Sequence, residues 1–174
     1  MRNLIILSLA FIAFGFVAAT SKQERRTTCD VEDAKVKLKK ELVPYRYTNL
    51  SVQRIFFRRY NQKKSVSFPL MFDTKHRFVF NTENLPQNIK VKVYSDNEFV
   101  KKRQELASFN SEDGQFTYEP DISQPLPYIY FEFLIPASIA EDTRSIPKGC
   151  VVIMVGYEDE YAEEFEGMGT SGTE

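Results

Sequence analysis

The chain has 174 residues, 43% hydrophobic and 27% charged side chains, and a formal net charge of −1. Its 15 Phe and nine Tyr, with few Gly and with charges spread along the chain, are typical of a folded domain and exclude a disordered polypeptide. The single histidine, His76, excludes sites that need several histidines. We interpret it as an exposed or hydrogen-bonded strand residue.

Residues 1–19 have the pattern of an export signal. Arg2 provides a positive start, residues 4–17 form an apolar run, and small side chains precede Thr20. Because the apolar run is short for a bilayer span, we expect cleavage near Thr20 and no membrane span afterwards. The sequence therefore predicts an exported protein, periplasmic or extracellular.

The mature chain divides into a basic body and an acidic tail. Residues 20–157, the size of one domain, carry 22 Lys and Arg against 17 Asp and Glu, a net charge of +5. Residues 158–174 carry seven acids and no basic residue. This composition predicts a flexible tail that either keeps the protein soluble or binds a partner.

Cys29 and Cys150 are the only cysteines. In an oxidising compartment an isolated pair is expected to form a disulfide, and two buried free thiols are the alternative. Neither cysteine has metal-ligand spacing, so the sequence predicts no metal site and no cofactor.

Residues 30–43 have the pattern of an amphipathic helix. Val31, Ala34, Leu38 and Leu42 repeat at intervals of three and four residues, and Pro44 ends the pattern. We interpret the lysine-rich remainder as a solvated face, with a membrane or nucleic-acid surface as the weaker alternative.

After the helix, apolar residues alternate with polar ones, which predicts strands. A bulge is expected near Arg54, and Pro69 indicates an edge strand or a bulge. The eight expected strands lie at about 50–57, 65–70, 77–81, 89–94, 104–109, 115–119, 128–135 and 150–157. The expected centre of the core is Ile129, Phe131, Phe133, Val151, Ile153 and Val155.

No second helix is long enough for a parallel crossover, so the fold class is all-β, an antiparallel two-sheet β-sandwich or jelly roll with one N-terminal helix. The last strand is apolar on both faces. We therefore place it in the middle of a sheet, with the other sheet on one side and the helix on the other.

Four segments resemble the pre-peptidase C-terminal type of exported β-sandwich. They are residues 75–80 (KHRFVF), 91–96 (VKVYSD), 128–133 (YIYFEF) and 149–155 (GCVVIMV). The resemblance implies a jelly-roll-like module that accompanies secreted enzymes or serves adhesion or folding, without catalytic residues of its own. The chain departs from that pattern in its N-terminal helix, its cysteine pair and the lack of an enzyme domain in these residues.

Basic and aromatic residues alternate after the first strand. Arg58, Arg59 and Arg54 stand among Phe56, Phe57 and Tyr60, followed by Lys63 and Lys64. This composition is typical of a surface for an anionic glycan, a lipopolysaccharide or nucleic acid, and export disfavours nucleic acid. The alternative is a basic hairpin whose aromatic side chains turn into the core.

Tyr128 and Tyr130 share one face of their strand with Glu132, opposite Phe131 and Phe133. If the Phe side faces the core, the tyrosines line an outer surface suited to stacking on sugar rings or docking a partner. Burial under a loop is the alternative.

Two carboxylate pairs, Glu112 with Asp113 and Glu119 with Asp121, are candidates for calcium binding or acid–base chemistry, or are solvated turn residues. The sequence thus predicts a non-catalytic exported protein that binds a protein or glycan partner or supports a cell-envelope assembly. The alternative is a carbohydrate-active hydrolase, or an accessory domain of one, that uses carboxylates.

Overall fold

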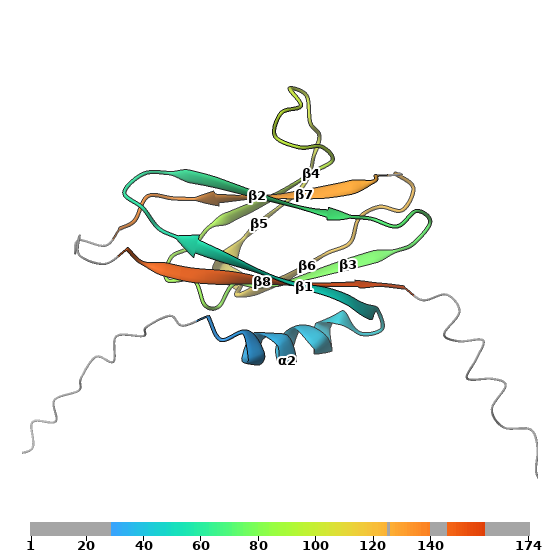
Figure 1. Cartoon of the computed structure of the whole chain (residues 1–174), viewed down its shortest axis with the longest axis horizontal. Helices are drawn as coiled ribbons and strands as arrows, with labels where there is room; N and C mark the ends of the chain where they lie inside the picture. Colours follow the sequence, from blue (N-terminus) through green and yellow to red (C-terminus); the bar gives the residue numbers. More distant parts are fainter. Residues whose placement is uncertain (1–28, 125, 140–145, 159–174) are drawn as a thin grey trace, which may run out of the picture.

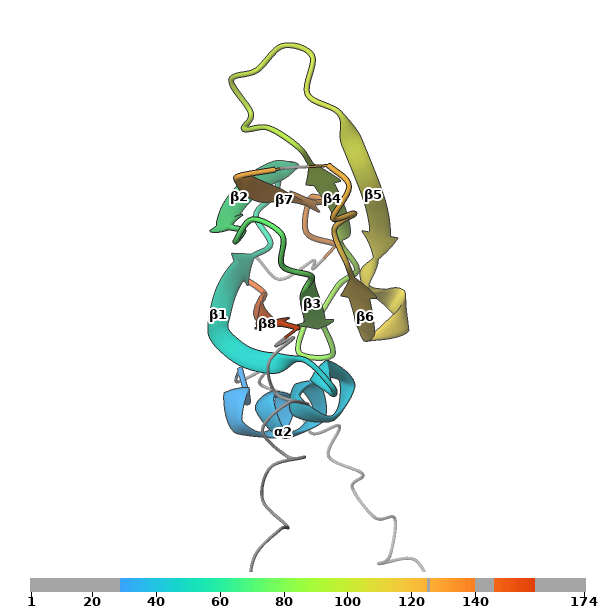
Figure 2. The same cartoon turned by 90° about the vertical axis from the view of Figure 1, so that its right-hand side faces the viewer.

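The computed structural model describes residues 29–124, 126–139 and 146–158. The predicted signal peptide and the predicted tail beyond Glu158 lie outside these ranges. Two antiparallel four-stranded sheets pack face to face, and a helix covers the outer side of one of them (Figures 1 and 2). The predicted β-sandwich with eight strands and one helix is confirmed. None of the described helices is long and apolar enough to cross a membrane.

The elements follow one another in a simple order. They are α2 (Val31–Leu42), β1 (Arg46–Phe56), β2 (Gln62–Pro69), β3 (His76–Asn81), β4 (Lys90–Tyr94), β5 (Glu105–Asn110), the 3-10 turn η1 (Ser111–Asp113), β6 (Gln115–Tyr118), β7 (Tyr128–Ile135) and β8 (Lys148–Tyr157). One sheet has the order β1-β8-β3-β6 and the other β2-β7-β4-β5. Pro69 lies on the edge strand β2, as predicted, where its missing N–H breaks no central ladder.

The inner faces of the two sheets enclose the core. All six side chains predicted for its centre are at most 5% exposed, and Phe131 contacts the rings of Phe68, Phe78 and Phe80 with centroids 5.0 to 5.8 Å apart. Edge-to-face and tilted ring pairs of this kind add to the stability gained from burial alone. Alternation with period two therefore located the core correctly.

Helix α2 packs on the outer face of the first sheet. Asp30 caps it by accepting a hydrogen bond from the Asp33 N–H at 3.1 Å, and the helix ends one residue before the expected Val43. Ala34, Leu38 and Leu42 are at most 2% exposed, and their burial stabilises the fold by about 1.5–3 kcal/mol for each leucine. They pack against Val79, Cys150, Val152 and Met154.

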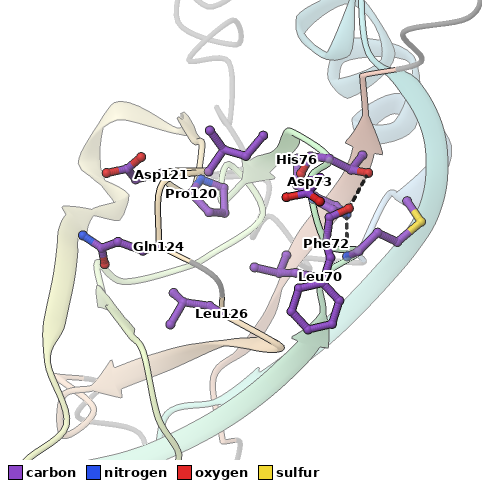
Figure 3. Close-up of a pocket in the computed structure, with 11 residues that line it drawn as sticks. Leu70, Phe72, Asp73, His76, Pro120, Asp121, Gln124 and Leu126 are labelled. Atoms are coloured by element: carbon purple, nitrogen blue, oxygen red, sulfur yellow. Dashed lines mark hydrogen bonds between the residues drawn. The ribbon is translucent and has the colours of Figure 1, made fainter.

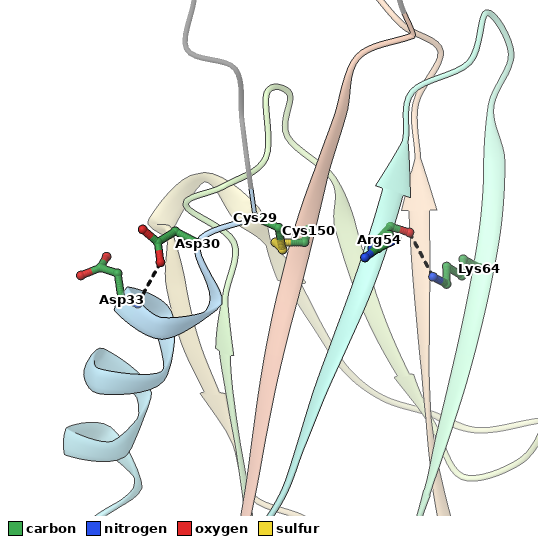
Figure 4. Close-up of a disulfide and its surroundings, with 6 residues drawn as sticks. All are labelled: Cys29, Asp30, Asp33, Arg54, Lys64 and Cys150. Carbon is green, nitrogen blue, oxygen red and sulfur yellow. Dashed lines mark hydrogen bonds between the residues drawn. A yellow bond between two sulfur atoms is a disulfide. The ribbon is translucent and has the colours of Figure 1, made fainter.

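Cys29 and Cys150 form the predicted disulfide, with Cα atoms 5.7 Å apart (Figure 4). The bond joins the residue before the helix cap to the central strand β8. It ties the helix layer to the sheet across a sequence separation of 121 residues.

The predicted hairpin of the basic segment is wrong, and so is the bulge near Arg54. β1 pairs with β8 and β2 with β7, so the segment between them crosses from one sheet to the other. The β1 register is regular from Asn49 to Phe56, and the irregularity lies between Tyr47 and Asn49. Along β1 the apolar residues shift from even to odd positions, because the first part of the strand packs against the helix through Leu50 and the second part packs into the sandwich core through Ile55.

Candidate functional site

The basic segment lies at one end of the sandwich, beside the connection from β7 to β8 (Figure 1). Phe57 is 1% exposed, whereas Phe56 and Tyr60 are 46% and 57% exposed. Arg58 donates from Nη1 to the Tyr60 hydroxyl at 2.8 Å, and its carbonyl accepts from the Ser138 N–H at 2.6 Å. Only one of the three aromatic side chains therefore turns into the core.

Arg54 is separated from Arg58 and Arg59. It precedes the buried Ile55 in β1, so its side chain points to the opposite face of the strand. Lys64 of β2 donates from Nζ to the Arg54 carbonyl at 3.0 Å across the gap between the two sheets (Figure 4). Burial lowers the pKa of Lys64, and its contact occupies a carbonyl of the edge strand β1.

The predicted tyrosines lie on the outer face of the second sheet. Tyr128 is 46% exposed, Tyr130 is half-buried, and their ring centroids are 6.4 Å apart at 41°. Tyr128 pairs with Pro69 and Tyr130 with Ser67 of β2, while Tyr130 also pairs with Tyr94 of β4. Directly paired residues share a face, so these side chains form one aromatic surface.

Glu132 lies in the same row, but its side chain is only 2% exposed. For Glu132 the alternative of burial therefore applies, and the expected exposure on an outer surface does not. Arg103 donates from Nη2 to its Oε2 at 2.7 Å, and Lys63 approaches its Oε1 at 3.7 Å. The Arg103 guanidinium also stacks on the Tyr94 ring, 3.7 Å from its centroid. The hydrogen bond to Glu132 raises the pKa of Arg103.

Sequence reasoning missed Arg103 and Tyr94 as parts of this surface. Arg103 comes from the 95–104 loop, which projects beyond the sheet in Figure 1 and is closed at its base by a hydrogen bond from the Ser95 N–H to the Gln104 carbonyl at 3.1 Å. The available signal was Glu132 itself, a carboxylate inside an otherwise apolar strand that needs a cationic partner if buried.

A recess of about 150 Å³ lies between this loop and the outer sheet face. Its walls combine aromatic, charged and small polar residues with one aliphatic residue: Ser65, Val66, Ser67, Asn97, Glu98, Phe99, Arg103, Tyr130 and Glu132. We name the recess, together with Tyr94 and Tyr128, the tyrosine face.

A smaller pocket of about 40 Å³ opens at the other end of the sandwich, between the β2–β3 and β6–β7 connections (Figure 3). His76 is buried beside it, with Nδ1 2.9 Å from the Thr74 carbonyl and Nε2 3.4 Å from the Met71 nitrogen. An imidazole that donates from Nδ1 and accepts at Nε2 satisfies both contacts and is neutral. His76 therefore holds the β2–β3 connection in place.

Burial lowers the pKa of His76 from its ordinary 6.5, with the Thr74 hydrogen bond acting in the opposite direction. The unfolded chain then binds a proton at a higher pH than the folded chain does. The stability associated with neutral His76 is complete above about pH 6.5 and is lost as the pH falls through the unfolded and then the folded pKa.

We expect the melting temperature of the wild type to fall between about pH 7 and pH 5, whereas that of His76→Gln should change less over this interval. His76 is the only histidine, and the carboxylates titrate mainly below this range. Thermal unfolding followed by circular dichroism at several pH values checks the result. Parallel curves for the two proteins would show that His76 takes up no proton on unfolding.

Two of the four candidate carboxylates, Glu119 and Asp121, bind other side chains of the protein. Arg77 donates from Nε to Glu119 Oε1 at 2.7 Å, and the Tyr45 hydroxyl donates to Glu119 Oε2 at 3.2 Å. Asp121 accepts from the backbone and hydroxyl of Ser123, which lowers the pKa of its carboxyl. Glu112 and Asp113 lie exposed in η1. Within the described residues, no group of three His, Cys, Asp or Glu is placed to hold a metal ion.

No known protein family profile matches the sequence, and no curated protein matches it. Among solved structures, PliG of Aeromonas hydrophila, a periplasmic inhibitor of g-type lysozyme, is 12% identical with a TM-score of 0.38, over 63% of this chain and 86% of its own. A mutant of the family 29 carbohydrate-binding module CBM29-2 is 16% identical with a TM-score of 0.30, over 70% and 99% of the two chains. These similarities are too distant to assign a function.

Proposed function

We propose that this chain is an exported, non-catalytic binding protein and that its tyrosine face holds a glycan. The observation that supports this most is the row formed by Tyr128, Tyr130 and the buried Glu132–Arg103 pair on an outer sheet face. Export is inferred from the signal pattern and from the disulfide, which persists in oxidising compartments.

The chemistry of the face favours a sugar over an apolar ligand. Tyrosine rings present flat apolar area with a polar hydroxyl at one end, which matches the mixed C–H and O–H surface of a pyranose. Ser65, Ser67 and Asn97 add neutral hydrogen-bonding groups around the recess. Arg103 is held in position by its hydrogen bond to Glu132, so its guanidinium can orient hydroxyl groups of a ligand without becoming further ordered.

The carboxylate arrangement gives less support to the hydrolase alternative. A glycosidase needs two carboxyl groups on either side of one bond, usually with the pKa of one of them raised. Glu119 is engaged by Arg77 and Tyr45, and the pKa of Asp121 is lowered, which suits a structural turn residue better than a general acid.

The proposal predicts that Tyr130→Ala and Tyr128→Ala each weaken glycan binding by about two- to tenfold, because each removes one stacking ring worth about 0.5–1.5 kcal/mol beyond its buried area. Ligands are first identified on an array of cell-wall and extracellular polysaccharide fragments. The dissociation constants of the best ligand for the wild type and both variants are then compared by isothermal titration calorimetry.

Tyr47→Ala is the matched control. Tyr47 is 48% exposed, close to the 46% of Tyr128, but lies on β1 in the other sheet. Its replacement should leave the dissociation constant unchanged. Equal losses for all three variants, or binding that survives the double replacement of Tyr128 and Tyr130, would contradict a glycan site on this face.

A further inference from the structure

Both ends of the long axis of the sandwich carry charged side chains. Figure 1 shows the β1–β2 connection at one end, and the β2–β3 connection and the end of β8 at the other. The first end, which we call the basic end after the arginines of the β1–β2 connection, carries exposed Arg58 and Arg59. Exposed Glu83, Glu112 and Asp113 lie in other connections at this end. The second carries exposed Asp73, Lys75 and Asp121, and the chain leaves it at Tyr157 toward the acidic residues that follow.

The basic end also exposes apolar surface. Phe56, Tyr60, Ile139 and Ile146 are 46%, 57%, 82% and 58% exposed. No Asp or Glu occurs anywhere between Glu41 and Asp73, so the β1–β2 connection has no acidic neighbour in sequence. The β7–β8 connection, residues 136–147, contains Glu141 and Asp142 against Arg144, and Lys148 follows as the first residue of β8. Solvent-exposed aromatic and aliphatic side chains beside two arginines are typical of a docking surface.

The chain itself contains a segment of complementary composition. Residues 159–166 read DEYAEEFE, five acids with two aromatic residues, Tyr161 and Phe165, and no basic residue. The segment begins directly after Glu158, whose carboxylate pairs with Lys75 at 2.6 Å at the second end. Acidic and aromatic residues in this segment match the arginines and apolar side chains of the basic end in both charge and polarity.

The segment cannot reach the basic end of its own molecule. β8 extends about 30 Å from Lys148 to Tyr157 at about 3.3 Å per residue. Lys148 pairs with Phe56, and Arg58 and Tyr60 follow Phe56 in the chain, so they lie farther from Tyr157 than Lys148 does. From Tyr157 to Phe165 a fully extended chain spans at most about 29 Å. The path is longer than the straight line, because the sandwich lies between the two ends.

We propose that residues 159–166 of one copy dock on the end formed by Phe56, Arg58, Arg59 and Tyr60 of a second copy. The glutamates and Asp159 face the two arginines, while Tyr161 and Phe165 cover the exposed apolar side chains. The segment and the β1–β2 connection are different parts of the chain, so the contact joins unlike surfaces. It does not involve the tyrosine face, and so it is independent of glycan binding.

A synthetic peptide of residues 157–168 tests the contact directly. Fluorescence anisotropy measures its binding to full-length protein in which the competing segment carries Glu163→Gln, Glu164→Gln and Phe165→Ala. We expect saturable binding that weakens on the order of tenfold between about 0.05 and 0.5 M NaCl and on the order of tenfold or more with Arg58→Glu and Arg59→Glu. Tyr60→Ala, which keeps the charge, should weaken it less but measurably.

Lys101→Glu and Lys102→Glu provide the matched control, since they reverse two exposed charges on the 95–104 loop. This double variant should change the dissociation constant of the peptide by no more than about twofold once salt screens the long-range attraction between distant charges. Equal weakening by both charge reversals, or no weakening by the arginine pair in a protein with a native circular dichroism spectrum, would overturn the proposed site.

Sedimentation of the full-length proteins tests the association between copies. The average mass of the wild type should rise with concentration, while the segment variant and the arginine variant each remain monomeric. Mixing the two variants should restore a one-to-one complex, because one supplies an intact segment and the other an intact basic end. A wild type that stays monomeric to hundreds of micromolar, or two variants that do not complement each other, would overturn the proposal.

Discussion

Replacing Phe131 by alanine should lower the free energy of unfolding by about 3–5 kcal/mol. Phe131 is fully buried on β7, and its ring lies against those of Phe68, Phe78 and Phe80. These neighbours come from both sheets, so their backbones cannot close the cavity without disturbing the sandwich. Urea denaturation followed by circular dichroism measures the change.

Phe99→Ala is the control for this substitution. Phe99 is 86% exposed on the 95–104 loop, so the same chemical change should alter stability by no more than about 0.5 kcal/mol. A loss below about 1 kcal/mol for Phe131→Ala would mean that the Phe face of β7 does not form the centre of the core.

Removing the disulfide by Cys29→Ala and Cys150→Ala should lower the free energy of unfolding by about 4–5 kcal/mol. The bond closes a loop with a sequence separation of 121 residues, and without it the unfolded chain gains the entropy of that open loop. Alanine is chosen because Cys150 is fully buried between α2 and the sheet, where a serine hydroxyl would need a partner. Guanidinium denaturation of the wild type and the double variant gives the difference. Hydrogen exchange should show the largest loss of protection in α2.

Reduction of the wild type with dithiothreitol is the matching chemical control and should reproduce most of this loss. Mass spectrometry of the exported protein after alkylation without reductant should find no modified cysteine. Two alkylated thiols in that sample would show that the native protein does not carry the bond.

The sequence by itself determined the elements and their faces. The four-residue spacing of Ala34, Leu38 and Leu42 predicted which side of α2 is buried, and alternation along β7 and β8 predicted the core. The disulfide followed from there being only two cysteines. These inferences succeed because helix and strand periods depend on the backbone alone, and burial then selects the apolar side.

Only the tertiary structure decided which elements are neighbours. Periodicity placed Tyr128, Tyr130 and Glu132 on one face, but it carried no information about Arg103, which reaches Glu132 from a loop 29 positions away. Likewise β1 and β2 adjoin in sequence yet join different sheets, so the expected hairpin is a crossover. Strand alternation determines to which face a side chain points, but it does not determine which strand lies alongside. Pairing depends on long-range contacts, and a local pattern carries no information about their packing or about the entropy of closing the loops between them.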